Sequence, residues 1–431
     1  MSKFQIILIS IFVVCIIGGI VAFATYKGNT TENELPAITV WGTFPAAIFD
    51  KYVIDLNTTR EKALNISYVQ IRAENFDKTF IETLARGQGP DAILIPQDLI
   101  YKHEDKIIPI PYTVISERDF RDTFIRQSEL YLTGNGALAL PFVVDPLVMY
   151  WNRDSFTNAG IAKPPIFWDE FDNLNTKLTQ KDINSNVRKS AIALGEFNNI
   201  SHAREIFGTL LMQAGNPITY RNTENFISSA LKNGNYQGLN SSLAALDFFI
   251  QFSNPKSVNY SWNRSLSNSR SSFLSGNLAT YFGFASEISD LRAKNPNIDF
   301  DVAPLPQARN GKNRATYGGM YGFSVVRSSA NPSNTFSVVN SLLSSSALSN
   351  MIKLSYLPPV RLDMISTGST DPYLSIFYDS ALISKGWLDV SPAESNAILQ
   401  KMIEAVTSGR KGATNAVEEA SDELDILFQN I

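Results

Sequence analysis

Histidine and cysteine, which carry much of the nucleophilic and zinc chemistry of proteins, are rare in this chain of 431 residues. It has two histidines, His103 and His202, and one cysteine, Cys15. A single cysteine excludes an intrachain disulfide and a thiolate metal cluster, and a zinc site or a histidine-based triad would have to use one of only two histidines. We therefore expect no metal ligands, no catalytic residues and no cofactor.

Paired carboxylates are a catalytic arrangement that the composition leaves open. Asp98 follows a predicted buried strand, and Asp145 lies among apolar residues, where a carboxylate without partners would be costly. Two such groups on either side of a glycosidic bond would make a carbohydrate-active hydrolase. The sequence does not give the separation of Asp98 and Asp145, so an exported hydrolase stays an alternative.

Charge and composition narrow the class of protein further. The chain has 37 Lys plus Arg against 41 Asp plus Glu, a net charge of -4, and we expect no nucleic-acid partner because non-specific binding requires a basic surface. Hydrophobic residues make up 44% and charged residues 18%, which predicts a globular rather than a disordered chain. At roughly 100–200 residues per domain, the length allows two or three domains.

The N-terminus carries an apolar run, Ile6–Ala24, close to the length of about 20 residues that crosses a bilayer as a helix. Lys3 precedes it and would keep that end in the cytoplasm, so that the rest lies outside. The alternative is a cleaved signal peptide, because Ala22-Phe23-Ala24 fits a cleavage site. We expect residues 1–25 to be a membrane anchor or a signal segment and residues 26–36 to be a tether. The protein would stay on the outer side of the cell membrane or, after cleavage, be secreted or periplasmic.

Strands and helices alternate from residue 37 onward. Apolar spacing predicts strands at Ala37–Val40, Leu64–Ile71 and Asp91–Ile95, with a helix between each pair. Asn75 can cap the second of these helices. This order predicts an α/β lobe with ligand loops at the carboxyl ends of its strands. The later predicted elements are strands at Leu147–Trp151, Leu278–Phe282, Phe300–Ala303 and Tyr321–Val326, and helices at Trp168–Leu178, Ser241–Phe252, Ser375–Lys385, Glu394–Ser408 and Ala413–Phe428.

Six short segments follow one another along residues 37 to 430 in a recognisable order. They are Gly89–Pro96, Leu140–Asp154, Pro164–Phe171, Phe273–Thr280, Asp301–Pro306 with the later Tyr317-Gly318-Gly319 and Ser324-Val325-Val326, and Leu357–Arg361. Together they resemble the family 1 extracellular solute-binding proteins of ABC importers, the maltose-binding-like, carbohydrate-binding group. The first loop, Trp41-Gly42-Thr43-Phe44-Pro45, lacks the acidic and basic pair of maltose-binding relatives, which argues against maltodextrin as the ligand.

The resemblance implies an α/β, two-lobed periplasmic-binding-protein-like fold (type II), with lobes joined by crossover strands and, here, an N-terminal transmembrane helix before them. The first lobe would comprise residues 37–143 plus 327–372, and the second residues 144–326 plus 373–431. Crossings between the lobes would lie near Val143–Pro146, near Ser324–Arg327 and between Arg361 and Tyr373.

The resemblance also implies a ligand site between the lobes, closed by a hinge. Sugars suit such a site, because their C–H faces stack on aromatic rings and their hydroxyls bond to carboxylates and amides. Packing, helix capping and hinge hydrogen bonds are the competing roles of each candidate. The candidate ligand-binding residues are Trp41, Thr43, Asp98, Asp145, Asn198, Phe284, Tyr317, Gly318, Arg361 and Trp387.

The function implied is capture of a sugar or oligosaccharide outside the cytoplasm, by hinge closure, and its delivery to an ABC import permease. Such a protein is not an enzyme. We expect a monomer whose partners are a carbohydrate ligand, the permease subunits and, through the N-terminal helix, the membrane. A membrane-tethered binding or sensor module that works without a transporter is a further alternative.

Overall fold

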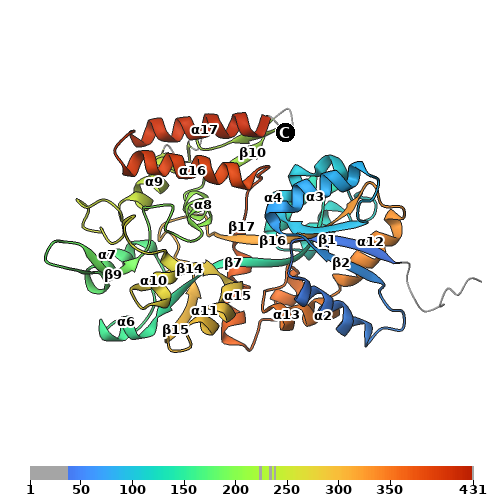
Figure 1. The fold of residues 1–431 in the computed structure, drawn as a ribbon, viewed down its shortest axis with the longest axis horizontal. Coiled ribbons are helices and arrows are strands. Elements are labelled where there is room, and N and C mark those ends of the chain that lie inside the picture. Colours follow the sequence, from blue (N-terminus) through green and yellow to red (C-terminus); the bar gives the residue numbers. More distant parts are fainter. Residues whose placement is uncertain (1–36, 223–225, 233–234, 237–238, 430–431) are drawn as a thin grey trace, which may run out of the picture.

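The computed structural model describes residues 37–222, 226–232, 235–236 and 239–429. They form an α/β structure of two lobes that lie side by side, with two long strands running from one lobe to the other (Figure 1). The main sheet has the strand order β2-β1-β3-β16-β7-β14-β9-β8, so a single sheet passes through both lobes. This confirms the predicted two-lobed α/β architecture.

The first lobe begins with the predicted alternation of strands and helices. The parallel strands are β1 (Ile38–Gly42), β2 (Ile66–Gln70) and β3 (Ala92–Pro96), and the helices between them are α2 (Ala46–Asn57) and α3 (Ala73–Ala85). Four of the five residues of β3 are buried, as expected for a strand covered on both faces. The carboxyl ends of β1 and β3 point toward the second lobe.

The start of α3 differs from the prediction. Its N-cap is Arg72, whose backbone is extended, and the helix begins at Ala73. Asn75 therefore lies within the first turn and does not cap the helix. Arg72 makes no side-chain capping bond, so the helix starts without the polar cap that the sequence offered.

The two crossing strands are β7 (Leu140–Asn152) and β16 (Thr316–Val326), which run antiparallel. Residues 140–146 of β7 pair with β16, and the remainder of β7 lies between β14 (Leu278–Phe284) and β15 (Phe300–Pro304) in the second lobe. β7 thus belongs to the sheet of the first lobe at one end and to the sheet of the second lobe at the other, which places the first crossing where it was predicted.

The second crossing lies earlier in β16 than predicted. Residues Tyr321–Val325 already pair with β3 of the first lobe, whereas Thr316 and Tyr317 pair with β17 (Ser384–Lys385). The prediction near Ser324–Arg327 is therefore wrong by several residues. The apolar run of Tyr321–Val326 is the buried interior of the first-lobe sheet, and Gly318 and Gly319 stand closer to the crossing.

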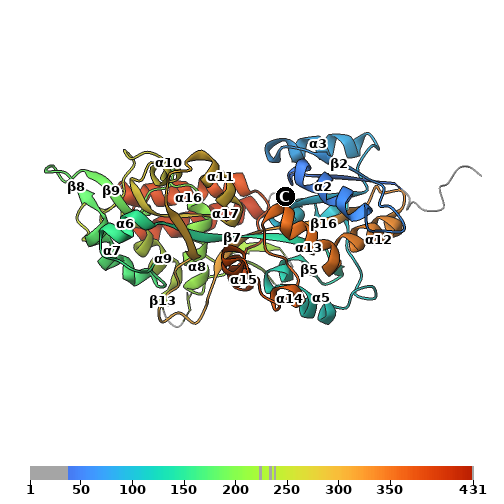
Figure 2. The same cartoon turned by 90° about the horizontal axis from the view of Figure 1, so that it is seen from below.

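A third link joins the lobes through helices. α13 (Ser345–Ser355) packs on α2 of the first lobe, and α15 (Pro372–Leu382) packs on β7 and β15 of the second lobe. The short helix α14 (Leu362–Ile365) lies between them. Seen from below, α13, α14 and α15 follow one another across the boundary (Figure 2).

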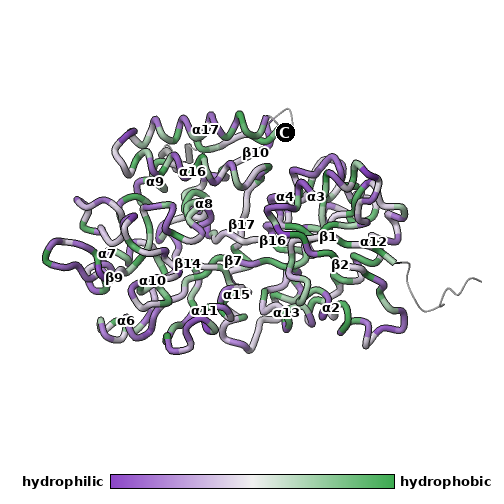
Figure 3. The backbone as a smooth tube through the Cα atoms, viewed as in Figure 1, coloured by the Kyte–Doolittle hydropathy of each residue, from purple (hydrophilic) through white to green (hydrophobic). Residues whose placement is uncertain are grey.

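Helices cover the second lobe on its outer side. The last two, α16 (Pro392–Thr407) and α17 (Ala413–Gln429), pack against each other along the edge of the molecule (Figure 1). Hydrophobic residues concentrate on the central strands of both lobes, and hydrophilic residues on the outer loops and helix faces (Figure 3). The other elements are α4 (Gln97–Lys102), η1 (Glu104–Lys106), β4 (Ile107–Ile108), α5 (Glu117–Thr123), η2 (Arg126–Tyr131), β5 (Leu132–Thr133), β6 (Gly136–Ala137), α6 (Arg153–Asn158), η3 (Trp168–Glu170), α7 (Phe171–Leu178), β8 (Gln180–Lys181), β9 (Val187–Ile192), α8 (Ala203–Gln213), β10 (Thr219–Arg221), β11 (Ile227–Ser229), β12 (Asn235–Tyr236), β13 (Leu239–Asn240), α9 (Ser241–Ile250), α10 (Ser269–Leu274), η4 (Ala285–Glu287), α11 (Ile288–Lys294) and α12 (Pro332–Leu342).

The predicted anchor, Ile6–Ala24, and the predicted tether, 26–36, lie outside the described residues. Within the part of the chain that the structure describes, no helix is both long and apolar enough to span a membrane.

Candidate ligand-binding site between the lobes

Asp98 and Arg204 join the two lobes. Asp98 is the second residue of α4, which starts directly after β3 in the first lobe, and Arg204 is the second residue of α8 in the second lobe. Oδ2 of Asp98 lies 3.4 Å from Nη2 of Arg204, and both residues are buried. The lobes are therefore in contact in this structure, through an ion pair that is largely shielded from water.

Two further carboxylates surround the Arg204 guanidinium. Asp389 forms an ion pair with it, and Glu205 does so at 3.1 Å. Burial raises the pKa of Asp98 to about 6, although the attraction of Arg204 opposes this shift. Asp98 therefore holds its proton to a higher pH than an ordinary aspartate, and we expect the contact between the lobes to depend on pH.

Trp387 and Tyr317 complete this cluster. The indole of Trp387 lies 4.5 Å from the Arg204 guanidinium, measured to the ring centroid, and 5.1 Å from the Tyr317 ring. The Tyr317 hydroxyl lies 3.5 Å from Oδ2 of Asp98. Gly208 of α8 leaves the space for the indole, since a Cβ there would lie 2.6 Å from a ring carbon. Three predicted ligand residues from different parts of the chain thus meet here.

Asp145 and Phe284 lie near the crossing strands, on either side of Gly319. A Cβ on Gly319 would lie 3.7 Å from the Phe284 ring and 4.0 Å from Cβ of Asp145. The backbone N–H of Ser286 donates a hydrogen bond of 3.0 Å to Oδ1 of Asp145, and burial raises the pKa of this carboxyl to about 7. Asp145, which was predicted to contact the ligand, therefore makes the hydrogen bond that was its competing role, and its partner belongs to the second lobe.

His202 stands beside this group. Its ring lies 4.7 Å from the ring of Phe284, and its Nε2 lies 2.7 Å from Oε1 of Glu287. Burial opposes the charge of His202, but Glu287 raises its pKa above the ordinary value. His202 therefore takes up a proton more readily than an ordinary histidine, and its charge is paired with Glu287.

The first-lobe loop at Trp41 and Thr43 reaches the same crossing. Trp41 is half-buried on β1 and packs against the core, and the Thr43 N–H donates to the carbonyl of Leu94 at 3.2 Å. The next ring, Phe44, lies 5.3 Å from that of Tyr321 on β16. The loop is thus fixed against β16 by backbone and ring contacts.

A cavity of about 380 Å³ opens between the lobes next to Trp387. Such a volume lies in the range of sites for small molecules. The first lobe contributes residues of η2, and the second lobe contributes the end of α8, the loop after it and the segment around β17. The lining residues are Arg126, Gln127, Glu129, Leu130, Met212, Gly215, Asn216, Pro217, Thr219, Asn313, Lys385, Gly386, Trp387 and Leu388.

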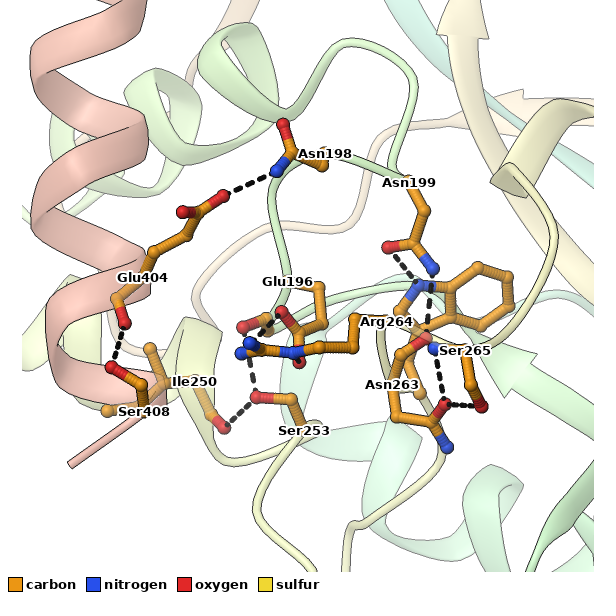
Figure 4. Close-up of polar contacts among 12 residues, drawn as sticks. Glu196, Asn198, Asn199, Ile250, Ser253, Asn263, Arg264, Ser265, Glu404 and Ser408 are labelled. Carbon is orange, nitrogen blue, oxygen red and sulfur yellow. Dashed lines mark hydrogen bonds and ion pairs between the residues drawn. The ribbon is translucent and has the colours of Figure 1, made fainter.

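Asn198 binds a helix of its own lobe in this structure. Its amide nitrogen donates to Oε1 of Glu404 at 2.6 Å, and its amide oxygen accepts from Gln400 at 2.8 Å. Both partners lie on α16, and Figure 4 shows the contact with Glu404. The loop of Asn198 is thereby held to α16, which is a structural role.

The rest of this loop is tied to the chain around Arg264. Glu196 is buried and faces the Arg264 guanidinium at 3.4 Å, and Asn199 donates to the carbonyl of Asn263 at 2.9 Å (Figure 4). Burial raises the pKa of Glu196, while Arg264 opposes that shift. These contacts fix the loop that leads into α8 and so position Arg204.

Gly318 and Arg361 also have structural partners. The carbonyl of Gly318 accepts from Gln97 and Gln127, and a Cβ on Gly318 would lie 2.5 Å from the Gln127 side chain. Arg361 forms an ion pair with Asp363 at 2.9 Å within the first lobe. Gly318 thus packs against the first lobe, and Arg361 lies apart from the cluster of Asp98, Tyr317 and Trp387.

Sequence reasoning missed Arg204, Asp389 and Lys385. Arg204 lies in a helix whose other residues are mostly apolar, and a buried arginine in such a helix is a signal that could have been read. Asp389 follows Trp387 by two residues but stands in no pattern of its own. Lys385 lies on a strand of two residues, which is too short for periodicity to predict.

The comparisons with known proteins agree with this architecture. The model of the family described as bacterial extracellular solute-binding protein matches residues 43–347, well over half of the chain. No curated protein sequence matches the chain.

Solved structures share the fold at low sequence identity. The cyclic α-maltosyl-1,6-maltose binding protein from Arthrobacter globiformis has a TM-score of 0.73 at 16% identity, covering 92% of this chain and 99% of its own. A cyclo/maltodextrin-binding protein complexed with maltotetraose has a TM-score of 0.70 at 15% identity, covering 93% and 98%. The GacH receptor of Streptomyces glaucescens has a TM-score of 0.67 at 15% identity, covering 91% and 98%.

Proposed function

Because this chain belongs to the family of bacterial extracellular solute-binding proteins, we propose that it captures a sugar or oligosaccharide between its lobes and delivers it to an ABC import permease. Capture takes place outside the cytoplasm, and the ligand is released unchanged. The family is one of binding proteins and not of enzymes, which is the class that the sequence predicted.

The observation that carries this proposal is the cavity of about 380 Å³, which is lined from both lobes and has Trp387 in its wall. A ligand in this position touches both lobes, so its binding favours the closed arrangement. The ring of Trp387 offers an apolar face to a sugar in this cavity, and Tyr317 packs against that ring outside the lining.

The ligands named for the similar structures support a saccharide. The proteins described above are named for maltosyl-maltose or complexed with maltotetraose, and the GacH receptor was determined with acarbose. A further similar structure holds mannotriose. Since the identities are at most 17% for these four, they suggest the class of ligand and not its identity.

We assign the ligand contacts to residues that converge between the lobes. The list is Trp387, which lines the cavity, and Trp41, Thr43, Asp98, Asp145, Phe284 and Tyr317, which lie outside its lining. The other predicted residues, Asn198, Gly318 and Arg361, have partners within the protein and serve as supports of the fold.

The N-terminal segment holds the binding protein at the membrane surface in this proposal. Ile6–Ala24 forms a single-pass anchor, and residues 26–36 link it to the first lobe. N-terminal sequencing of the native protein checks this: a chain that begins near Met1 and sediments with membranes supports the anchor, and a soluble chain that begins near Thr25 supports cleavage.

A thermal-shift screen of residues 36–431 against mono- and oligosaccharides, polyols and peptides tests the binding function. A ligand that binds only the folded state increases the free energy of unfolding by about 2.7 kcal/mol at a ligand concentration of a hundred times Kd. The melting temperature rises as a result. Mass spectrometry of a bound saccharide should then return its input mass. Fragments that disappear in Asp98→Asn or Asp145→Asn would show a hydrolase instead.

A further inference from the structure

Two cations face the cavity between the lobes. Arg126 belongs to η2 of the first lobe, and Lys385 belongs to β17, which pairs with β16 at the second-lobe end. Both line the same cavity next to Trp387. The two charges therefore come from two neighbouring elements that line the same space.

Neither cation is neutralised by the protein. Among the described residues, Arg126 and Lys385 form no ion pair and no side-chain hydrogen bond; Arg126 is exposed to solvent, whereas Lys385 is half-buried. The one carboxylate in the lining, Glu129, is already in an ion pair with Arg121 at 2.5 Å. The residues that line the cavity thus include two cations without an ion-pair partner and one carboxylate that is already paired.

The surroundings of Lys385 disfavour the charge of its ammonium group. Lys385 is half-buried, and burial, followed by repulsion from Arg126, lowers the pKa of its ammonium group. An anion between the two side chains would remove both unfavourable effects. Charge-assisted hydrogen bonds to a carboxylate, sulfate or phosphate are also among the strongest that a side chain makes.

We propose that the ligand is an acidic saccharide, whose anionic group lies between Arg126 and Lys385 while a sugar face lies against Trp387. This inference rests on the proposed function, since it names the ligand class of the same site. The anion contacts both lobes at once, so its charge contributes to closure as well as to affinity. A neutral saccharide of the same size lacks this bridge.

Isothermal titration of residues 36–431 with matched probes tests the inference. Trigalacturonate supplies carboxylates, a sulfated chondroitin disaccharide supplies sulfate and glucose 6-phosphate supplies phosphate, and maltotriose is the neutral probe. We expect at least one anionic probe to bind about tenfold or more tightly than maltotriose, which corresponds to about 1.4 kcal/mol. Its affinity should weaken as NaCl rises from about 0.05 M to about 0.5 M.

Variants assign the effect to the two side chains. Lys385→Met and Arg126→Gln should each weaken binding of the anionic probe by about tenfold, and weaken it more than they weaken binding of maltotriose. Lys353→Met on α13, an exposed lysine outside the cavity, is the matched control and should change nothing. Thermal melts of each variant verify that the fold is retained.

The possible results separate the two proposals. If maltotriose binds as tightly as every anionic probe, or if the variants leave the anionic probe unaffected, the acidic ligand is refuted and the saccharide-binding function stands. If no saccharide of either kind binds, the binding function fails and the acidic ligand fails with it.

Discussion

Asp145 is a carboxyl group whose surroundings oppose its charge. Its pKa of about 7 exceeds its usual value of 3.8, chiefly because of burial. A raised pKa in the folded state means that the folded protein binds the proton more tightly than the unfolded chain does. The contribution of Asp145 to stability is therefore complete below about pH 4 and is lost progressively as the pH rises to about 7.

Asp145→Asn should remove this pH dependence. The amide oxygen can still accept from the Ser286 N–H, but the side chain no longer ionises. Melting temperatures should be measured between pH 4.5 and pH 8. The melting temperature of the variant should rise relative to that of the wild type as the pH increases to about 7. Asp169→Asn, which removes an exposed ion pair with Arg309, should give a constant offset. Parallel profiles for Asp145→Asn and the wild type would refute the assignment.

Phe282 and Phe284 of β14 differ in role although they stand two residues apart. Phe282 is buried against Trp168, with ring centroids 5.4 Å apart, whereas Phe284 is half-buried beside His202. Phe284→Ala should weaken the binding of a saccharide by about 2 kcal/mol, which is roughly a thirtyfold loss of affinity, and should change the melting temperature little. Phe282→Ala should cost about 3–5 kcal/mol of stability. Calorimetry and thermal melts distinguish the two, and a Phe284→Ala protein that melts far lower but binds normally would place that ring in the core.

Helices α4 and α8 carry the contact between the lobes at the scale of elements. The Asp98–Arg204 pair links them, and a second contact joins Arg221 of β10 to Glu104 at 3.3 Å and to the ring of Tyr101. Arg204 keeps Asp389 and Glu205 as partners within its own lobe when Asp98 is neutralised. Loss of the Asp98 charge therefore loosens the lobes without leaving the arginine unpaired.

Asp98→Asn should accordingly shift the ligand-free protein toward separated lobes. A hydrogen bond to a charged group contributes about 1.5–3 kcal/mol, enough to change the populations of two arrangements that are close in energy. Small-angle scattering at pH 8 should show a larger radius of gyration than for the wild type. The difference should shrink at pH 5, where Asp98 of the wild type is itself protonated. Asp363→Asn, which breaks a pair inside the first lobe, should leave the radius unchanged, and an unchanged radius for Asp98→Asn would refute the contact.

The sequence predicted short elements with strong periodicity well and the long crossing strands poorly. It predicted a strand only at Leu147–Trp151, because Pro141 and Pro146 lack N–H donors and so argue against a central strand. In the structure β7 begins at Leu140 and includes both prolines. Both prolines lie opposite glycines of β16, where the pairing is tolerated. Of the candidate site, Asp98, Tyr317 and Trp387 lie together between the lobes, and their contact with a ligand stays a prediction. Asn198 binds α16, since a polar side chain in a loop carries no sign of which partner it will reach.

Three links connect the lobes at the scale of the whole molecule: two strands and the segment around α14. A saccharide that bridges the lobes should shift the population toward the closed form and so reduce the radius of gyration. Small-angle scattering with and without a saturating saccharide measures this. A profile that does not change at saturation would contradict hinge closure even where calorimetry shows binding.

The order of strands also has a consequence for how the chain folds. β16 lies between β3 and β7 in the sheet, yet it is synthesised more than 150 residues after β7, as the positions of the two strands show. Until it arrives, β3 and β7 each expose an unpaired edge to the solvent, and such edges invite pairing with other chains. Pairings so distant in sequence also slow folding, because the connecting loop must close first. We expect refolding to be slow and its yield to fall as the protein concentration rises, because the exposed edges pair with other chains. During synthesis, a chaperone would have to protect these edges until β16 has emerged.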